Sequence, residues 1–484
     1  MPTAVSVPAS FSDKITDFFL AFRDLLRLPA AFWIIVLSFM INAMPYFGIL
    51  TLMTTYLHAD LGVPDRWASP IVSVFTAFVT LFMLGLGSLA EKLGVRRGLR
   101  LALVFCVVGR VLYSSAPGAS HGPWVFVPVI VFALMLVAIG EAIQQPLTYS
   151  GSKQYTDEKT SAMGYGLIYA LMNLGIFLIG WWSPLIRVPI DKIREAKLAG
   201  TTPPESILAP LAERVSSGVS GVNWVCTTIN IVGLLFLTLF LTRRVEANRL
   251  REEDAAQKLA ELEANANKSW SQRAFDYFAE GPFTNLRFIF FIFMLFPVQT
   301  LFAHQWLTMP NYVLRAYPEK VAERMEWIVN WINPGIIFLG VPIITAMTRR
   351  ISVYTMMIIG SAVSAIPTFF LCSEPNLYLL ITYLVLFSIG EALWQPRFLQ
   401  YAAELAPEGK VAQYMGLANV PWITVKMTTG IYSGKILEIY CPEKGAQDVS
   451  TMWLIYGLIA ITTPIGLILG RKWVLSGKQM GGGK

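Results

Sequence analysis

Long apolar runs are the dominant feature of this chain, and many approach the ~20 residues that cross a bilayer as a helix. They recur from residue 31 to residue 473 and are separated by shorter polar segments. Only 14% of the 484 residues are charged and 55% are hydrophobic, which is too little charge for the surface of a soluble protein. The runs lack the short alternating pattern of an outer-membrane barrel. We therefore predict an all-α integral membrane protein.

Twelve transmembrane helices are predicted. With the N-terminus inside, most of the 38 Lys and Arg residues fall on the inner side, which favours cytoplasmic N- and C-termini. The expected location is the cell (inner) membrane, crossed many times. The predicted spans are residues 31–57, 69–90, 99–116, 124–147, 162–186, 222–242, 286–314, 326–347, 352–372, 376–398, 411–434 and 450–473.

Polar segments divide the chain. Residues 10–27 carry apolar side chains at helical spacing, so the N-terminal segment is expected to lie along the membrane surface. The loop at 187–221 is expected outside, with partial order at best. The predicted divisions are an amphipathic segment 1–30, a six-helix bundle 31–242, a polar cytoplasmic linker 243–285, a six-helix bundle 286–474 and a tail 475–484.

The two halves share short motifs. GEAIQQP at 140–146 and GEALWQP at 390–396 each place a glutamate near the end of an apolar run. The pair Met163-Gly164 matches Met415-Gly416, and Gly87 with Arg96-Arg97 matches Gly340 with Arg349-Arg350, all at nearly one offset. This repetition indicates two pseudo-symmetric six-helix bundles, as in transporters whose halves pack around a central cavity.

The segment GSLAEKLGVRR at 87–97 resembles the signature of the major facilitator superfamily between spans 2 and 3. That signature combines a glycine, an acid, a base, a second glycine and a basic pair. The resemblance implies a major facilitator fold and a loop that helps to hold the halves in one conformation. The residues concerned are Gly87, Glu91, Lys92, Gly94, Arg96 and Arg97.

Further segments resemble one branch of that superfamily, the proton-dependent oligopeptide transporters (the POT or PTR family). IYALMNLG at 168–175 is similar to its span 5 and WINPGIIFLGVPI at 331–343 to its span 8. The stretch 389–416 is similar to its span 10 and the following loop. The resemblance implies that Glu391 faces the cavity and engages the peptide amino group or a charged neighbour.

The chain also departs from that branch. The family's ExxER motif in span 1 is absent, because those positions hold Phe39, Asn42 and Ala43. The family's span 4 lysine appears as Gln145, and residues 243–285 are too polar to supply the two extra helices of many bacterial members. These departures indicate a divergent relative whose substrate need not be a peptide.

Four ionisable residues fall well inside the predicted spans, where an unpaired charge costs roughly 3 kcal/mol or more. Arg110 and Glu141 belong to the N-terminal half, and Glu391 and Lys426 to the C-terminal half. They form either one pair within each half or a contact across the cavity that breaks as the halves rock. A carboxylate that loses its basic partner in a dry site can then bind a proton. A purely structural pair is the competing interpretation.

The expected substrate-binding or coupling residues are these four charges together with polar and aromatic residues of spans that line the central site. For each aromatic residue, ordinary packing is the competing interpretation. The additional candidates are Tyr46, Gln145, Tyr149, Tyr169, Asn173, Gln299, Asn333 and Trp394.

We predict a secondary active transporter that moves a small organic solute, a peptide or peptide-like compound, by alternating access with proton coupling. One alternative is a facilitator or an exporter of drugs or metabolites with the same fold. Another is a membrane sensor or scaffold that does not transport. Nothing predicts an enzyme, a nucleic-acid partner, a metal or a cofactor other than the proton gradient as driving force. The expected partners are a small-molecule substrate and the lipid bilayer, with the protein as a monomer.

Overall fold

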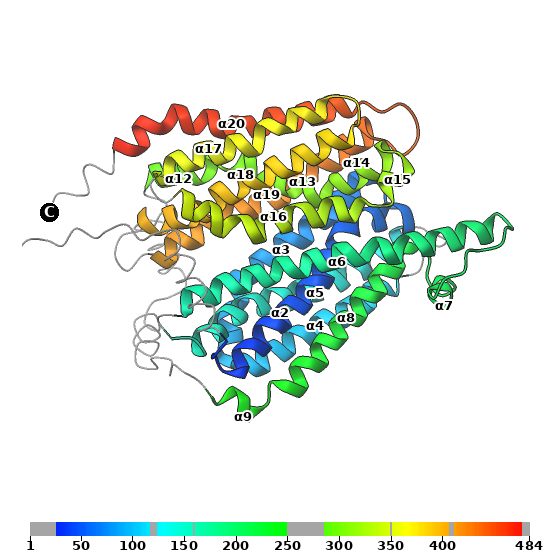
Figure 1. Ribbon diagram of the computed structural model, residues 1–484, viewed down its shortest axis with the longest axis horizontal. Coiled ribbons are helices and arrows are strands. Elements are labelled where there is room, and N and C mark those ends of the chain that lie inside the picture. The colour runs from blue at the N-terminus through cyan, green and yellow to red at the C-terminus, as the bar shows by residue number, and fades with distance from the viewer. Residues whose placement is uncertain are drawn as a thin grey trace, which may run out of the picture.

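The computed structural model describes residues 26–116, 123–157, 160–248, 285–348, 351–405 and 411–476. The described residues form helices and connecting segments, without a β-strand (Figure 1). Residues 1–25 of the predicted amphipathic segment, residues 249–284 of the predicted linker and residues 477–484 of the tail lie outside this part. The linker begins with a short helix, α9 (Arg243–Glu246).

Six long helices form the N-terminal half. Proline occurs inside several of them, as membrane helices tolerate. They are α2 (Ala30–Thr55), extended by the π-helical turn η1 (Tyr56–Asp60), α3 (Asp65–Leu93), α4 (Val95–Ser114), α5 (Pro123–Gln154), α6 (Ser161–Leu198) and α8 (Gly218–Phe240).

The C-terminal half repeats this plan with more interruptions. Its first span is divided where Pro297 and Pro310 begin new helices, because proline has no amide hydrogen to continue the previous one. The elements are α12 (Leu286–Met294), α13 (Phe296–Leu307), α14 (Met309–Ala316), the short α15 (Glu319–Ala322), α16 (Met325–Met347), α17 (Val353–Ala365) with the 3-10 turn η4 (Ile366–Cys372), α18 (Leu377–Leu405), α19 (Val411–Tyr440) and α20 (Val449–Ser476).

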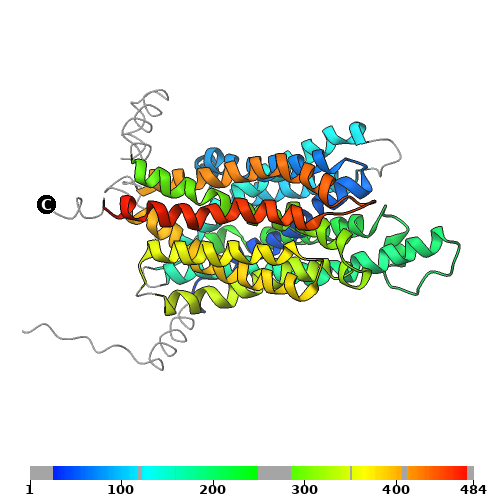
Figure 2. The same cartoon turned by 90° about the horizontal axis from the view of Figure 1, so that it is seen from above.

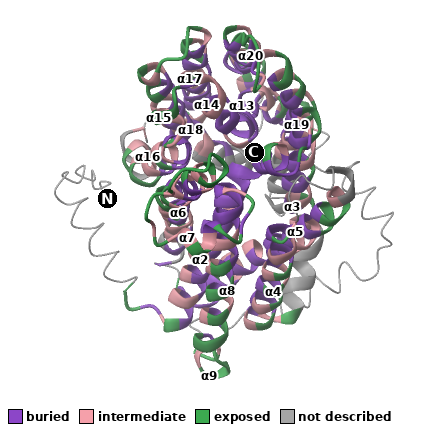
Figure 3. Ribbon diagram, turned by 90° about the vertical axis from the view of Figure 1, so that its right-hand side faces the viewer, coloured by how far each residue is buried: buried purple, intermediate pink, exposed green. Residues whose placement is uncertain are grey.

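Within the described ranges, nine helical stretches are long and apolar enough to cross a membrane. Helices α4, α16 and α19 complete the two sets of six. Figure 3 views the molecule along the helices, with α2 to α6 and α8 on one side and α13 to α20 on the other. Figure 2 shows the long helices running nearly parallel. The predicted fold of two six-helix bundles is confirmed.

The helices run between two ends of the molecule, called here the terminal end and the gate end. At the terminal end, α2 begins with Ala30 and α20 ends with Ser476. At the opposite gate end, α3 begins with Asp65 and α16 with Met325. The two ends lie at opposite sides of Figure 1.

Helix α6 overturns one prediction. The loop predicted at 187–221 begins instead as twelve further helical residues, because α6 continues to Leu198 and projects beyond the other helices (Figure 1). A short helix, α7 (Ala209–Ala212), folds back on it. Ile190 and Ile193 pack with Ala212 and Val215 in a small separate core. The segment is therefore ordered by its own apolar contacts.

A close helix crossing explains the glycine of each GEA motif. A Cβ atom on Gly140 of α5 would lie 2.5 Å from the carbonyl oxygen of Ala102 and 2.5 Å from the Cys106 sulfur, both on α4. A Cβ atom on Gly390 of α18 would lie 2.7 Å from the carbonyl oxygen of Gly360 on α17. The crossings α4–α5 and α17–α18 occupy equivalent positions in the two halves. Each following glutamate is turned about 100° from its glycine, away from the crossing.

We expect Gly140→Ala and Gly390→Ala each to destabilise the protein by about 1–3 kcal/mol, because a methyl group forces the crossing helices apart. The measurement is the thermal unfolding midpoint of purified protein in detergent. Gly166→Ala on α6 is the matched control, since a Cβ there meets no atom within 4 Å. Equal midpoints for all three variants would contradict the close packing.

Candidate functional site

Arg110 and Glu141 form a buried ion pair inside the N-terminal half. The Arg110 Nη2 atom on α4 lies 2.7 Å from Glu141 Oε1 on α5. Asn42 of α2 donates its Nδ2 hydrogens to both Glu141 oxygens at 2.9 and 3.0 Å. The Asn42 Oδ1 atom accepts from Arg110 Nη1 at 3.0 Å and from Asn230 Nδ2 of α8 at 2.7 Å. The predicted pair within the N-terminal half is therefore present.

This network ties together four helices of one half. Arg110 is 1% exposed and Asn230 is 0% exposed, so the carboxylate and guanidinium are compensated by each other and by the two amides. The Cys106 sulfur lies 3.7 Å from Glu141 Oε1 and adds a weak contact. Every one of these partners belongs to the N-terminal half, so the network does not depend on any contact with the other half.

Among the residues that the structure describes, the C-terminal half has no equivalent pair. Glu391 Oε2 accepts a hydrogen bond from Asn333 Nδ2 of α16 at 2.7 Å, and Asn333 Nδ2 also lies 3.0 Å from Ser388 Oγ. Lys426 of α19 instead donates to Thr80 Oγ1 of α3, in the other half, at 2.9 Å. In the described part of the chain, neither charge has an oppositely charged partner. The Glu391–Lys426 pair is absent because α19 directs Lys426 towards α3.

Several other candidates lie on α2, α5 and α6 of the N-terminal half. Tyr169 of α6 is half-buried and close enough to Glu391 to interact with its charge. Asn173 donates to the Tyr169 carbonyl oxygen at 2.9 Å. Gln145 and Tyr149 of α5 are half-buried. Tyr46 lines a cavity of about 10 Å³ beside Arg110, which has room for roughly one water molecule.

Two candidates lie within the packed interior of the C-terminal half. Trp394 is 0% exposed and packs its ring against Phe302 at 5.7 Å between centroids, and a Cβ on Gly360 would touch it at 2.8 Å. Gln299 of α13 is also 0% exposed, and its amide atoms have no partner among the described residues. In this arrangement neither side chain has exposed surface with which to meet a solute.

The residues of the predicted signature loop separate into two groups. Gly87, Glu91 and Lys92 lie in the last turns of α3, where the structure describes the helix but not these side chains. Gly94 precedes α4 with a φ of 76°, a conformation that favours glycine. Arg97 is exposed, whereas Arg96 Nε lies 2.9 Å from Glu246 Oε2 of α9. Arg96 thus binds the start of the linker rather than the opposite half.

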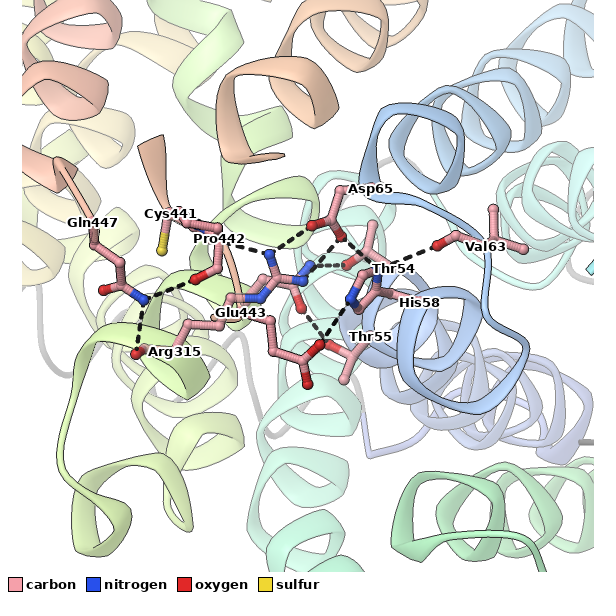
Figure 4. Close-up of polar contacts among 11 residues, drawn as sticks. Thr54, Thr55, His58, Val63, Asp65, Arg315, Cys441, Pro442, Glu443 and Gln447 are labelled. Atoms are coloured by element: carbon pink, nitrogen blue, oxygen red, sulfur yellow. Dashed lines mark hydrogen bonds and ion pairs between the residues drawn. The ribbon is translucent and has the colours of Figure 1, made fainter. Parts of the chain in front are cut away.

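Two arginine–carboxylate pairs join the halves at the gate end. Arg187 of α6 binds Glu326 of α16 through two contacts, Nε–Oε1 at 2.5 Å and Nη2–Oε2 at 2.8 Å. Arg315 of α14 binds Asp65 of α3 through Nη1–Oδ2 at 2.6 Å and Nη2–Oδ1 at 3.0 Å (Figure 4). Both pairs are buried and bidentate, which makes them strong and specific in direction.

The two acids occupy equivalent places in the repeat. Asp65 lies in the first turn of α3, and Glu326 lies in the first turn of α16, each the second span of its half. The partial positive charge at a helix N-terminus stabilises an acid there. Each acid takes its arginine from the other half, although the arginines lie on spans that are not equivalent, Arg187 on α6 and Arg315 on α14. We call these two pairs the gate pairs.

Further contacts close the gate end. Thr51 donates to Asn330 Oδ1 at 2.9 Å, and Thr55 donates to Asn311 Oδ1 at 3.0 Å. Lys192 pairs with Glu323, Arg66 with Glu438, and His58 with Glu443. In the described ranges, every ion pair between the halves lies at this end. These residues were not predicted from the sequence, in which their visible signal is the acid at the start of each second span.

The Arg110–Glu141 pair can be tested by removing one partner, which leaves the other charge buried and lowers the free energy of unfolding. We expect Arg110→Met to destabilise the protein by about 3–5 kcal/mol, since Glu141 is then left buried and uncompensated. The double variant Arg110→Met/Glu141→Gln should regain much of that loss. Unfolding midpoints of the two single variants and the double variant measure the coupling, and additive losses would contradict a direct pair.

The sequence similarities concern the N-terminal part of the chain. The model of the Major Facilitator Superfamily matches residues 2–180. YttB of Bacillus subtilis (strain 168), named an uncharacterized MFS-type transporter, is 25% identical over 179 residues, which are 36% of this chain and 42% of that protein. The alignment therefore spans less than half of the relative.

The comparison of structures covers both halves. A mutant of the peptide transporter POT in complex with alafosfalin matches with a TM-score of 0.68 over 92% of this chain and 95% of that chain, at 14% identity. A mutant of the nucleoside transporter NupG matches with a TM-score of 0.65 over 91% and 99%, also at 14% identity. At such identities the likeness concerns the fold. The fold of this chain resembles that of the POT-family peptide transporters over both halves, whereas the match to the Major Facilitator Superfamily model is confined to residues 2–180.

Proposed function

We propose that this protein is a secondary active transporter that carries a small, peptide-like organic solute across the cell membrane by alternating access, coupled to protons. With both termini in the cytoplasm, the gate end faces outside, and the structure is a state closed to the outside. The observation that carries the proposal is the distribution of charge between the halves. The halves are joined by ion pairs at one end, while Glu391 and Lys426 have no oppositely charged partner among the described residues.

The gate pairs suit a reversible closure. Each consists of one side chain from either half, so the halves can separate without unfolding a helix. Separation leaves four buried charges uncompensated unless water reaches them, which makes a half-open gate unfavourable. Closed and open arrangements are then two distinct states, as alternating access requires.

The central charges indicate the substrate class. Among the described residues, the Glu391 carboxylate accepts a hydrogen bond from one neutral amide, that of Asn333. The Lys426 ammonium group donates to the Thr80 hydroxyl. A solute with both a cationic amine and an anionic group satisfies both charges at once. Peptides and related zwitterions have that chemistry, and this is the class for which we infer transport.

Proton coupling follows from the same carboxylate. When no substrate amine is bound, Glu391 lacks a cationic partner in the described part of the chain, and a proton takes the place of the amine. A charge in this position is costly between membrane helices. Release of the proton and binding of the amine are therefore linked at one group.

A facilitator or exporter of the same fold is the second candidate. It is supported by Asn42, a neutral residue at a position where the oligopeptide transporters that this chain resembles have an acid. The Asn42 amide forms hydrogen bonds with Arg110, Glu141 and Asn230. The direction of flux and its dependence on a pH gradient separate the two candidates.

We expect protein reconstituted in liposomes to accumulate a zwitterionic peptide faster with an inward proton gradient than without one. Glu391→Gln should reduce that uptake by at least about tenfold, the value of one hydrogen bond to a charged group. Glu374→Gln, the same change at an exposed acid, is the matched control and should keep wild-type uptake. Equal uptake with and without the gradient would eliminate proton coupling.

The gate is tested by a distance between spin labels on Arg66→Cys and Glu438→Cys, which replace an exposed ion pair between the halves. The four natural cysteines are changed to alanine in this reporter protein. We expect Asp65→Asn/Glu326→Gln to shift the population from the short to the long distance by at least about a hundredfold in ratio, since it leaves two buried arginines uncompensated in the closed state. Glu213→Gln, which removes an ion pair inside the N-terminal half, should leave the distribution unchanged. An unaltered distribution in the double variant would contradict the role of the gate pairs.

A further inference from the structure

His58 lies beside one of the gate pairs, at the end of the first span. It belongs to η1, and its side chain is 25% exposed at the gate end. The Nδ1 atom lies 3.2 Å from the Val63 carbonyl oxygen and 3.3 Å from Asp65 Oδ1. The Nε2 atom lies 3.3 Å from Glu443 Oε2 (Figure 4). Both ring nitrogens therefore face oxygen acceptors.

This geometry fits a doubly protonated ring. A neutral imidazole has one donor nitrogen and one acceptor nitrogen, so in this position one nitrogen would face an oxygen without a hydrogen between them. The imidazolium ion donates from both nitrogens and satisfies both sides. It also places a positive charge between two carboxylates.

The same contacts connect the halves. Glu443 follows α19 in the C-terminal half, His58 and Asp65 belong to the N-terminal half, and Arg315 returns to the C-terminal half. Along this row the charges alternate as acid, base, acid, base when His58 is protonated. Gln447 steadies the Glu443 segment, because its Nε2 atom donates to the Arg315 carbonyl oxygen at 3.2 Å and to the Pro442 carbonyl oxygen at 3.0 Å (Figure 4).

We propose that His58 binds a proton from the outside solution and thereby stabilises the closed arrangement of the gate end. This activity is separate from proton coupling at the substrate site. Protonation adds a cross-half ion pair with Glu443 that only the closed gate contains. A ligand that binds one state better shifts the population towards that state. Outside acid therefore favours the closed gate, and neutral or alkaline solution releases it.

Two acids on the same side of the gate as His58 have other partners. Asp65 is engaged by Arg315 of α14, and the Arg315 Nη1 atom also donates to the Cys441 carbonyl oxygen at 3.1 Å. Asp60, on the same turn as His58, accepts from Ser216 at 2.9 Å. Histidine is the side chain that ordinarily changes charge between pH 5 and 8, and the partly exposed ring is open to protons at this end.

The test uses the spin-labelled reporter, at about pH 5.5 and about pH 8, on either side of the histidine range. We expect the ratio of short to long distances to be about fivefold higher at the lower pH, as for one partly exposed ion pair. His58→Gln should abolish that pH dependence and retain the lower ratio at both values. Glu443→Gln, a change at a side chain that is 60% exposed, should weaken the pH dependence of the ratio. His121→Gln, the same change at another of the three histidines, is the control and should behave as the parent.

Each remaining result overturns the proposal. A pH response that survives in His58→Gln assigns the sensor to another group. A parent protein that shows both distances in a ratio independent of pH eliminates the lock while leaving alternating access intact, on which the proposal rests. A single distance at every pH, in Asp65→Asn/Glu326→Gln as well, would refute alternating access and the lock together.

Discussion

An ionised side chain between membrane helices costs roughly 3 kcal/mol or more unless another group compensates it. That cost explains how the buried charges of this protein are paired. In the N-terminal half, Arg110 and Glu141 compensate each other inside a closed network. Between the halves, Arg187 and Arg315 can leave their acids only if water replaces them. The same penalty therefore holds the N-terminal helices together and, in the proposed transport cycle, allows the contact between the halves to be either closed or hydrated.

The fold was predictable where contact with lipid requires apolar residues in the sequence. Apolar runs located the spans to within a few residues for most helices, because lipid-facing and buried positions of a membrane helix are both apolar. Helix α6 shows the limit. Hydropathy ends the span at residue 186, but the helix continues in a polar stretch, where Ile190 and Ile193 find a partner surface on the segment around α7. A long-range contact decides that order, and hydropathy does not record it.

The site was predictable only in part, for a related reason. The repeated motifs located Glu141 and Glu391, and the pairing of Glu141 with Arg110 was one of the expected arrangements. Whether a charge has a partner depends on helix rotation, which turned Lys426 towards Thr80 and away from Glu391. The gate pairs join residues far apart in the chain, such as Asp65 and Arg315. A single sequence offers no sign of such pairing beyond an acid in each first turn.

The two GEA motifs have one structural role in common and differ in the other. Gly140 and Gly390 fix the same helix crossing in each half, so both glutamates are anchored to rigid bundles. The Glu141 partners all belong to its own half, and their geometry does not depend on how the halves are arranged. Glu391 has Asn333 in its own half, but Tyr169 approaches it from the other half. If the halves rock as proposed, the surroundings of Glu391 change and those of Glu141 do not, which makes Glu391 the acid that would sense the state of the transport cycle.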